Sequence, residues 1–479
     1  MSLIDVVVGV ALILIVFLAL LGLLRASLLI SSSSKAKAGA TAVATTHIEY
    51  LRSLPYDSVG TVGGIPAGPV AQYATTTLNG IPYGVRTFIQ YVDDSKDGTG
   101  ASDSNGITTD YKRVRVTATY TFRQEEREVA VVSNIAPPSI ESTTGGGTLR
   151  INAVDALGAP VPGAGVRIQN STVSPVVDFT TFADLTGAVL LPGAPASADY
   201  RITVSKDGYS TAETYVRDAT NQNPTPGYLT VAQNQTTSST FSIDVLAQLV
   251  MKTFSPIRAS STIDTFADTS LMQEMLSTQV SGGNLALSGA PLSYALSGSA
   301  RSVSFAPAYL SAWTSVDVSA TVPAGTSFTV SIADSTGALL SDAVLPGNAG
   351  GFSTFPIDLS LVSTTTYPAL QLRAQLSSDG ISTPTIASWT IAFDEGPVPL
   401  PNVPFTLTGV KKKGTTGAGV PIPKTIVSTT TSELGTRTLS LEWDVYELSL
   451  PGYTIVTASS APPYTLAPGT ATESALILQ

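Results

Sequence analysis

The feature that most constrains this chain is an uncharged apolar run close to its N-terminus. Residues 6–24 read VVVGVALILIVFLALLGLL and contain no charged side chain. As a helix, a run of this length extends for about 28 Å, which is close to the thickness of a bilayer core. The run can therefore cross a membrane. Outside a membrane, such a helix needs another apolar surface to cover it.

The charges around this run do not follow the order of a secretory signal peptide. A signal peptide places basic residues before a shorter apolar core and ends at a small-residue cleavage site. Here the apolar run begins almost at the first residue, and Arg25, Lys35 and Lys37 follow it.

An acid stands at the head of the run. A bare carboxylate is costly in lipid, so Asp5 needs a partner. The nearest candidate is an α-amino group, either that of its own chain or, in an array of parallel helices, that of Met1 in a neighbouring subunit.

The segment MSLIDVVVGVALILIVFLALLGLLRAS resembles the mature N-terminus of type IV pilins and pseudopilins, which carry a class III signal. The resemblance implies a leader removed by prepilin peptidase, methylation of Met1, and an assembly role for the acid at position five. Asp5 replaces the family's usual glutamate and is one methylene shorter. Since no leader is present, the sequence is taken to be in mature form.

The helix is expected to continue to residue 54, and Pro55 supplies its stop. His47 is expected to pack or lie at the surface. By family resemblance, the helix loses its structure around Gly22 when the filament forms. One stripe is apolar at helical spacing, and its members are Ala36, Ala40, Ala44, Ile48 and Leu51.

A small β domain is predicted for residues 55–138, with strands at 83–92, 112–122 and 129–135. The acid-rich loop between the first two strands resembles the first half of a calcium loop, where oxygen ligands alternate before a glycine. The bidentate glutamate of such a loop is missing. A solvated Asp/Gly turn is therefore favoured over a calcium site. The candidate ligands are Asp93, Ser95, Asp97, Asp103, Asn105 and Asp110.

Residues 139–245 and 397–479 repeat one template. In each, a glycine turn precedes a tyrosine-bearing strand that ends in Gly-Tyr. The pattern resembles the carboxypeptidase-regulatory-like domain, a prealbumin-type β-sandwich, and it implies a spacer or adhesive module without catalysis. The corresponding positions are Gly187, Tyr200, Gly208 and Tyr209 in the first copy and Gly435, Tyr446, Gly452 and Tyr453 in the second.

Residues 246–396 lack the repeat and loosely resemble jelly-roll sandwiches of lectin-like surface domains. Trp313 and Trp389 could form a sugar-stacking platform, but core positions are favoured. A basic hairpin in the last domain could contact DNA, a phosphate-rich envelope or the acidic face of a neighbouring subunit, but a solvated loop tip is favoured. Its lysines are Lys411, Lys412, Lys413 and Lys424.

Composition narrows the function further. Cysteine is absent, His47 is the single histidine and the net charge is −10. These values exclude disulfides, Cys/His zinc sites and cysteine nucleophiles, and they argue against a large nucleic-acid-binding face. The acid pair Glu125 and Glu126 falls in a predicted hairpin turn rather than a cleft. No enzyme activity and no certain cofactor is therefore predicted.

The sequence thus predicts a mainly β protein with one long N-terminal helix: a pilin helix (1–54), a pilin β domain (55–138) and tandem β-sandwiches. The expected function is that of a self-polymerising pilus subunit, held in the bacterial cytoplasmic membrane before assembly and displayed outside the cell afterwards. Its partners would be copies of itself, prepilin peptidase, the assembly machinery and, through the outer domains, surface glycans. The alternatives are a minor pilin at a filament tip and an anchored adhesin that never polymerises.

Overall fold

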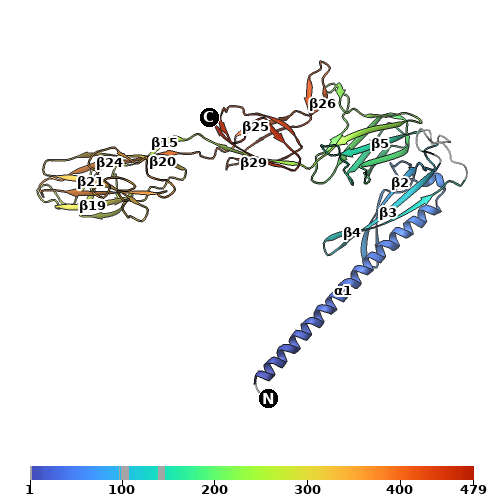
Figure 1. Ribbon diagram of the computed structural model, residues 1–479, viewed down its shortest axis with the longest axis horizontal. Coiled ribbons are helices and arrows are strands. Elements are labelled where there is room, and N and C mark those ends of the chain that lie inside the picture. Colours follow the sequence, from blue (N-terminus) through green and yellow to red (C-terminus); the bar gives the residue numbers. More distant parts are fainter. Residues whose placement is uncertain (1–2, 97, 99–106, 139–145) are drawn as a thin grey trace.

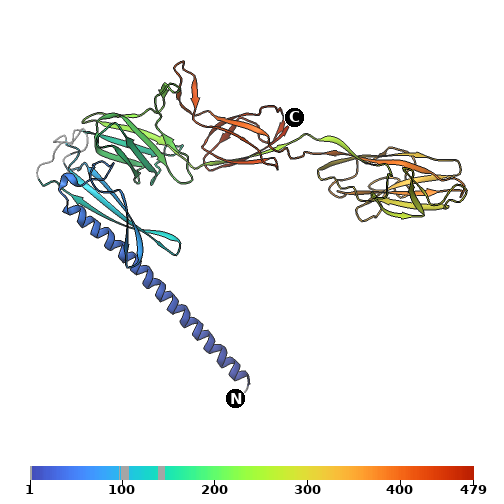
Figure 2. The same ribbon diagram turned by 180° about the vertical axis from the view of Figure 1, so that it is seen from behind.

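The computed structural model describes residues 3–96, 98, 107–138 and 146–479, with side chains from residue 14 onward. The chain is mainly β, as predicted, with one long helix at the N-terminus, α1 (Leu3–Ser53). Four β bodies follow one another as an extended arm that leaves the helix at its C-terminal end (Figure 1). Figure 2 shows the same arrangement from behind, with the C-terminus in the middle of the arm rather than at its tip.

The first body is a four-stranded antiparallel meander on which the C-terminal half of α1 packs. Its sheet has the order β1-β2-β3-β4. The helix ends two residues before Pro55, as predicted, and a 3₁₀ turn, η1 (Tyr56–Ser58), follows. The strands are β1 (Tyr73–Leu78), β2 (Ile81–Val92), β3 (Tyr111–Phe122) and β4 (Glu125–Ile135).

The predicted apolar stripe of the helix forms the core of this body. All five of its members are at most 3% exposed and lie in one cluster with the inward side chains of β2 and β3. The three predicted strands are confirmed. The hairpin predicted here is present, but its turn consists of Arg123 and Gln124, both with positive φ, and Glu125 and Glu126 begin strand β4 rather than lying in the turn.

The second body is a sandwich of two sheets, with the orders β10-β9-β6-β7 and β13-β5-β8; β12 also pairs with β9. Its strands are β5 (Gly146–Val154), β6 (Gly165–Asn170), β7 (Val177–Phe182), β8 (Ala188–Pro195), β9 (Ser197–Ser205), β10 (Ala212–Glu213), β12 (Leu229–Val231) and β13 (Thr236–Ser242). A short strand, β11 (Asn223–Pro224), leaves this sandwich and pairs with another body.

The third body along the arm contains the C-terminus. Its two sheets have the orders β29-β14-β33-β31 and β28-β25-β30-β32. The strands are β14 (Ala247–Phe254), β25 (Pro404–Gly409), β28 (Ile426–Thr430), β29 (Thr436–Leu441), β30 (Asp444–Ser449), β31 (Ile455–Ala458), β32 (Tyr464–Leu466) and β33 (Ala471–Leu478). A hairpin of β26 (Lys412–Thr415) and β27 (Pro421–Pro423) projects from it.

The two sandwiches share a topology. In the second body, β5 pairs in parallel with β13 and antiparallel with β8; in the C-terminal body, β14 pairs in parallel with β33 and antiparallel with β29. Tyr200 and Tyr446 are both fully buried and donate a hydrogen bond to a backbone carbonyl a few residues upstream. The sequence repeat therefore corresponds to a structural one.

The remaining body lies at the far end of the arm and is inserted after the first strand of the C-terminal sandwich. Residues 246–396 were predicted as one domain, but β14 lies in this range and is hydrogen-bonded into the C-terminal sheet. The inserted strands are β15 (Arg258–Asp264), β16 (Met272–Leu276), β17 (Thr278–Ser281), β18 (Asn284–Leu287), β19 (Ser297–Ser302), β20 (Leu310–Thr321), β21 (Ser327–Asp334), β22 (Ile357–Asp358), β23 (Leu370–Ser377) and β24 (Thr385–Glu395).

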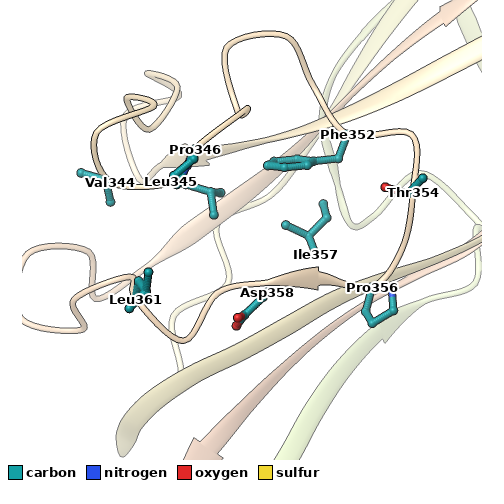
Figure 3. Close-up of a pocket in the computed structure, with 9 residues that line it drawn as sticks. All are labelled: Val344, Leu345, Pro346, Phe352, Thr354, Pro356, Ile357, Asp358 and Leu361. Carbon is teal, nitrogen blue, oxygen red and sulfur yellow. The ribbon is translucent and has the colours of Figure 1, made fainter.

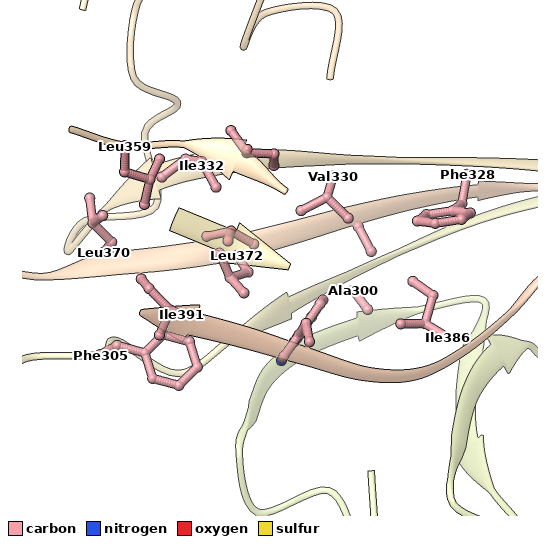
Figure 4. Packing of buried hydrophobic residues seen from close by; sticks show 14 of the residues in the cluster. Ala300, Phe305, Phe328, Val330, Ile332, Leu359, Leu370, Leu372, Ile386 and Ile391 are labelled. Atoms are coloured by element: carbon pink, nitrogen blue, oxygen red, sulfur yellow. The ribbon is translucent and has the colours of Figure 1, made fainter. Parts of the chain in front are cut away.

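The inserted body is a sandwich with a continuous apolar core between its two sheets, part of which Figure 4 shows. Trp313 and Trp389 belong to this core and are at most 1% exposed. The core interpretation of the two tryptophans is confirmed, and neither ring can stack on a sugar at the surface.

Candidate assembly surface and displayed arm

The apolar part of α1 is uncovered from Leu14 onward, where its side chains are described. From Leu14 to Ile30 nearly every side chain is exposed, and Phe17, Leu18 and Leu23 expose 57%, 59% and 68% of their surface. The described part of the helix is long and apolar enough to cross a membrane, and its most apolar stretch has no buried residue. This exposed half, residues 14–30, is therefore the surface that most needs a partner.

The packed half of α1, residues 36–51, is fitted closely to its own sheet. The Tyr83 hydroxyl donates a hydrogen bond to the Ala36 carbonyl at 3.0 Å, and a Cβ at Gly39 would lie 2.2 Å from that hydroxyl. His47 Nε2 lies 2.9 Å from the Thr87 hydroxyl, so the only histidine has the packing role expected of it. The helix is thereby held rigidly against the first body.

The assembly residues predicted from the family resemblance lie in the exposed part of the helix or before it. Met1 lies outside the described residues, and Asp5 belongs to α1 but its side chain is not described. Gly22 lies within an uninterrupted helix, and a Cβ added there would have no neighbour within 4 Å. The roles of these residues stay predictions.

A buried lysine secures the point where the helix meets the sheet. Lys112 is 1% exposed, and its Nζ donates a hydrogen bond to the Tyr56 carbonyl at 2.7 Å while lying 4.4 Å from the centre of the Tyr56 ring. Burial lowers the pKa of Lys112 to about 8. Sequence reasoning missed this residue because it took the strand containing Lys112 as an ordinary alternating one.

The predicted calcium loop is described only in part. Asp93, Ser95 and Asp110 belong to the described residues, whereas Asp97, Asp103 and Asn105 lie outside them. A carboxylate oxygen of Asp110 accepts a hydrogen bond from the Asp94 backbone. Within the described ranges, no group of three or more His, Asp or Glu side chains could hold a metal ion. The calcium site stays a prediction.

The first two bodies are joined through several backbone and side-chain contacts. The Asp178 amide donates to the Gly63 carbonyl at 2.8 Å. Arg86 donates to the Thr180 carbonyl at 2.6 Å, and its guanidinium carbon lies 4.6 Å from the centre of the Phe182 ring. All three of the contacted residues of the second body belong to β7, so these contacts constrain the direction in which the arm leaves the helix.

The second and C-terminal bodies are joined by a sheet shared between them. Strand β11 pairs with β26 of the projecting hairpin, which itself pairs with β27. The Asn221 side chain donates to the Lys413 carbonyl at 3.0 Å. The predicted basic contact hairpin therefore contacts the second body of its own chain.

Two lysines of this hairpin surround one acid. Glu442 is 7% exposed, and its Oε2 lies 2.6 Å from Lys424 Nζ and 3.7 Å from Lys411 Nζ. Lys424 also donates to the Thr211 carbonyl of the second body at 2.8 Å. Burial lowers the pKa of Lys411 to about 8, and its ammonium lies 3.1 Å from the centre of the Trp443 ring. Lys412 and Lys413 complete the predicted set.

The inserted body is tethered to the rest by two adjacent chain segments. The Ser255 amide donates to the Val398 carbonyl and the Gly396 amide donates to the Tyr309 carbonyl, both at 2.8 Å. Figure 1 shows this narrow two-strand connection between the C-terminal sandwich and the outermost body.

The inserted body also carries a depression lined mainly by apolar residues, shown in Figure 3. Asp358 is the one charged residue in its lining, and its carboxylate accepts a hydrogen bond from the Ser360 amide at 2.8 Å. The depression therefore offers apolar contact and no set of converging polar groups that would define a ligand.

Comparison with known protein families and with curated proteins finds no match. Solved structures match at low identity. The Bacillus anthracis TIE protein covers 86% of this chain and 74% of its own at 11% identity and a TM-score of 0.17. The match to BcpA, the major pilin subunit of Bacillus cereus, covers 69% of this chain and 99% of BcpA, at 10% identity and a TM-score of 0.15. The match to a Streptococcal ancillary pilin covers 76% of this chain and 75% of that pilin, at 9% identity and a TM-score of 0.18. TM-scores this low establish no common fold. The function has to be argued from the geometry.

Proposed function

We propose that this protein is the structural subunit of an extracellular filament of the type IV pilus kind. The exposed half of α1 would first hold the subunit in the cytoplasmic membrane and would then pack against the same segment of other copies. The β bodies would project outward as an arm. The subunit is proposed to have no catalytic activity of its own.

One observation carries this proposal: a single helix divides into a half covered by its own sheet and a half with no cover. Leu51 is fully buried, whereas Leu23, on the same helix, is 68% exposed. Moving apolar surface out of water is worth about 0.8 kcal/mol for each buried CH₂. Copies of the exposed half, packed side by side, provide that burial once the helix leaves the lipid.

The acid at position five fits the same scheme. In a bundle of parallel helices, Asp5 of one copy would meet the α-amino group of Met1 in another and so set the axial register between neighbours. Prepilin peptidase, the methylation of Met1 and the assembly motor belong to the proposal through the resemblance of the N-terminal segment.

The joined bodies of the arm would hold its outer end away from the filament axis. Its bodies are joined by the Arg86 contacts and by the sheet that β11 and β26 share. The inserted body would be presented furthest from the filament axis, where surface contact or adhesion takes place. Its ligand is not specified by any converging set of polar groups among the described residues.

The experiment is electron microscopy of filaments sheared from cells that make the protein, with mass spectrometry of the N-terminal peptide. Regular filaments that consist mainly of this chain and begin with a methylated Met1 are expected. A protein that stays in the membrane fraction, with no filament, would contradict the proposal. It would favour the anchored adhesin, for which the same helix and arm suffice.

A further inference from the structure

The helix presents cations that form no ion pair with any acid in the described part of the chain. Between residues 6 and 48 its charged residues are Arg25, Lys35 and Lys37, and no acid occurs in this stretch. Lys35 and Lys37 are exposed and flank Ala36, which faces the sheet at 3% exposure. In a bundle of parallel helices, like charges repel across the short distance between neighbours unless acids lie beside them.

The hairpin of β3 and β4 presents exposed acids at the same level along the helix. Arg127 Nη1 lies 3.5 Å from Ser33 Oγ, so the hairpin lies beside the helical turn that precedes the two lysines. Arg127 forms an ion pair with Glu125 at 3.1 Å. Glu126 and Glu128 are exposed, and neither forms an ion pair within the described part of the chain.

These two glutamates face away from their own helix. Successive side chains of a strand point to opposite faces, and Val129 and Val131 pack in the core beneath the helix. The outward row of β4 therefore lies on the far face of the sheet, and it consists of Glu126, Glu128, Ala130 and Val132.

We propose that in the filament this outward row of one subunit docks on the exposed face of α1 in a neighbouring copy, with Glu126 and Glu128 opposite Lys35 and Lys37. The inference rests on the proposed function and adds a second contact to it, outside the apolar bundle. Charge complementarity identifies the occupant as another copy. Lys35 and Lys37 lie on opposite sides of the helix, since each is about 100° from Ala36 around its axis, and the exposed Ala38 lies between them on the side away from the sheet. The outward row would therefore cross the helix and place one glutamate near each lysine.

The test is a charge exchange in the full chain. Lys35→Glu with Lys37→Glu, or Glu126→Lys with Glu128→Lys, is expected to lower the yield of sheared filaments about tenfold, because two pairs are lost and like charges replace them. The four substitutions combined are expected to restore the yield. A matched control, Asp207→Lys with Glu433→Lys, changes two exposed acids of the arm and is expected to leave the yield unchanged.

A zero-length carbodiimide crosslinker gives an independent measurement on wild-type filaments. Mass spectrometry is expected to find Lys35 or Lys37 joined by an amide bond to Glu126 or Glu128. The docking proposal would be overturned if wild-type filaments lack these crosslinks and each charge-reversal variant gives a normal filament yield. That result would leave the proposed function intact. A wild-type chain that forms no filament would overturn both.

Discussion

The two halves of α1 differ in what covers their apolar side chains. The packed half, residues 36–51, places its apolar stripe on β2 and β3, and each member of that stripe is at most 3% exposed. The exposed half, residues 14–30, is more apolar, yet none of the residues that the structure describes covers it. A packed half explains how the helix is fixed to the arm, and an exposed half explains why the subunit needs a membrane or other copies.

The largest effect is expected from charge in the exposed half. Leu18→Asp with Leu21→Asp is expected to abolish filaments, because each acid costs about 2.5–3.5 kcal/mol at the centre of an apolar helix in lipid. Both leucines are about half exposed in the isolated chain, so the arm should fold normally. Filament yield and the circular dichroism of the detergent-solubilised protein are the measurements. Leu157→Asp with Leu434→Asp, two exposed positions of the arm, is the control and should assemble normally.

Shortening a side chain in the packed half should lower the stability of the first body instead. Leu51→Ala is expected to lower the free energy of unfolding of the first body by about 2–5 kcal/mol, since it leaves a cavity in a fully buried site. Leu28→Ala, at a residue that is 63% exposed, should change it by less than about 0.5 kcal/mol. Hydrogen exchange of the β2 and β3 amides measures the free energy of unfolding of both variants. Equal losses of stability in the two variants would contradict the division of α1 into a packed and an exposed half.

The pH dependence of the first body is expected to depend on Lys112. Its pKa is about 8 in the folded chain and 10.5 as a free side chain, so the unfolded chain binds more protons between these values. Stability should therefore rise with pH across this window, by about 3 kcal/mol at most. Urea unfolding at pH 8 and pH 10 should show this rise in the wild type and lose it in Lys112→Met. A rise that persists in the variant would assign it to other groups.

The smallest effect on the isolated chain is expected from Gly22→Ala. The added Cβ would have no neighbour within 4 Å, and alanine favours a helix by about 1 kcal/mol over glycine. Folding should be unaffected. If the filament requires loss of helical structure around Gly22, the variant should assemble more slowly, and a time course of filament growth measures this. Unchanged growth would exclude a need for that loss.

Local patterns in the sequence predicted much of the fold. Pro55 marked the end of the helix, the spacing of Ala36 to Leu51 identified its packed face, and alternation located β2, β3 and β4. Such features depend on neighbours in the sequence. The pairing of β14 with β33, across more than two hundred residues, has no local signal.

The joints of the arm were also beyond sequence reasoning. The sequence left the hairpin of Lys411 and Lys424 open between a contact surface and a solvated loop tip, and it did not indicate that Lys424 would contact both the buried Glu442 and Thr211 of the second body. Likewise, Lys112 alternates in phase with the inward residues Val114 and Val116 of β3, and its ammonium is satisfied only by the distant turn at Tyr56. In each case a non-local contact decides what a charged residue does.

The most direct test of the central claim is an electron cryo-microscopy reconstruction of filaments from cells that make this chain. We expect a core of parallel helices in which residues 14–30 of neighbouring copies contact one another, with the β bodies outside. A filament whose core excludes this segment, or a chain found only as single subunits in the membrane, would contradict the claim that copies of the helix cover its exposed half.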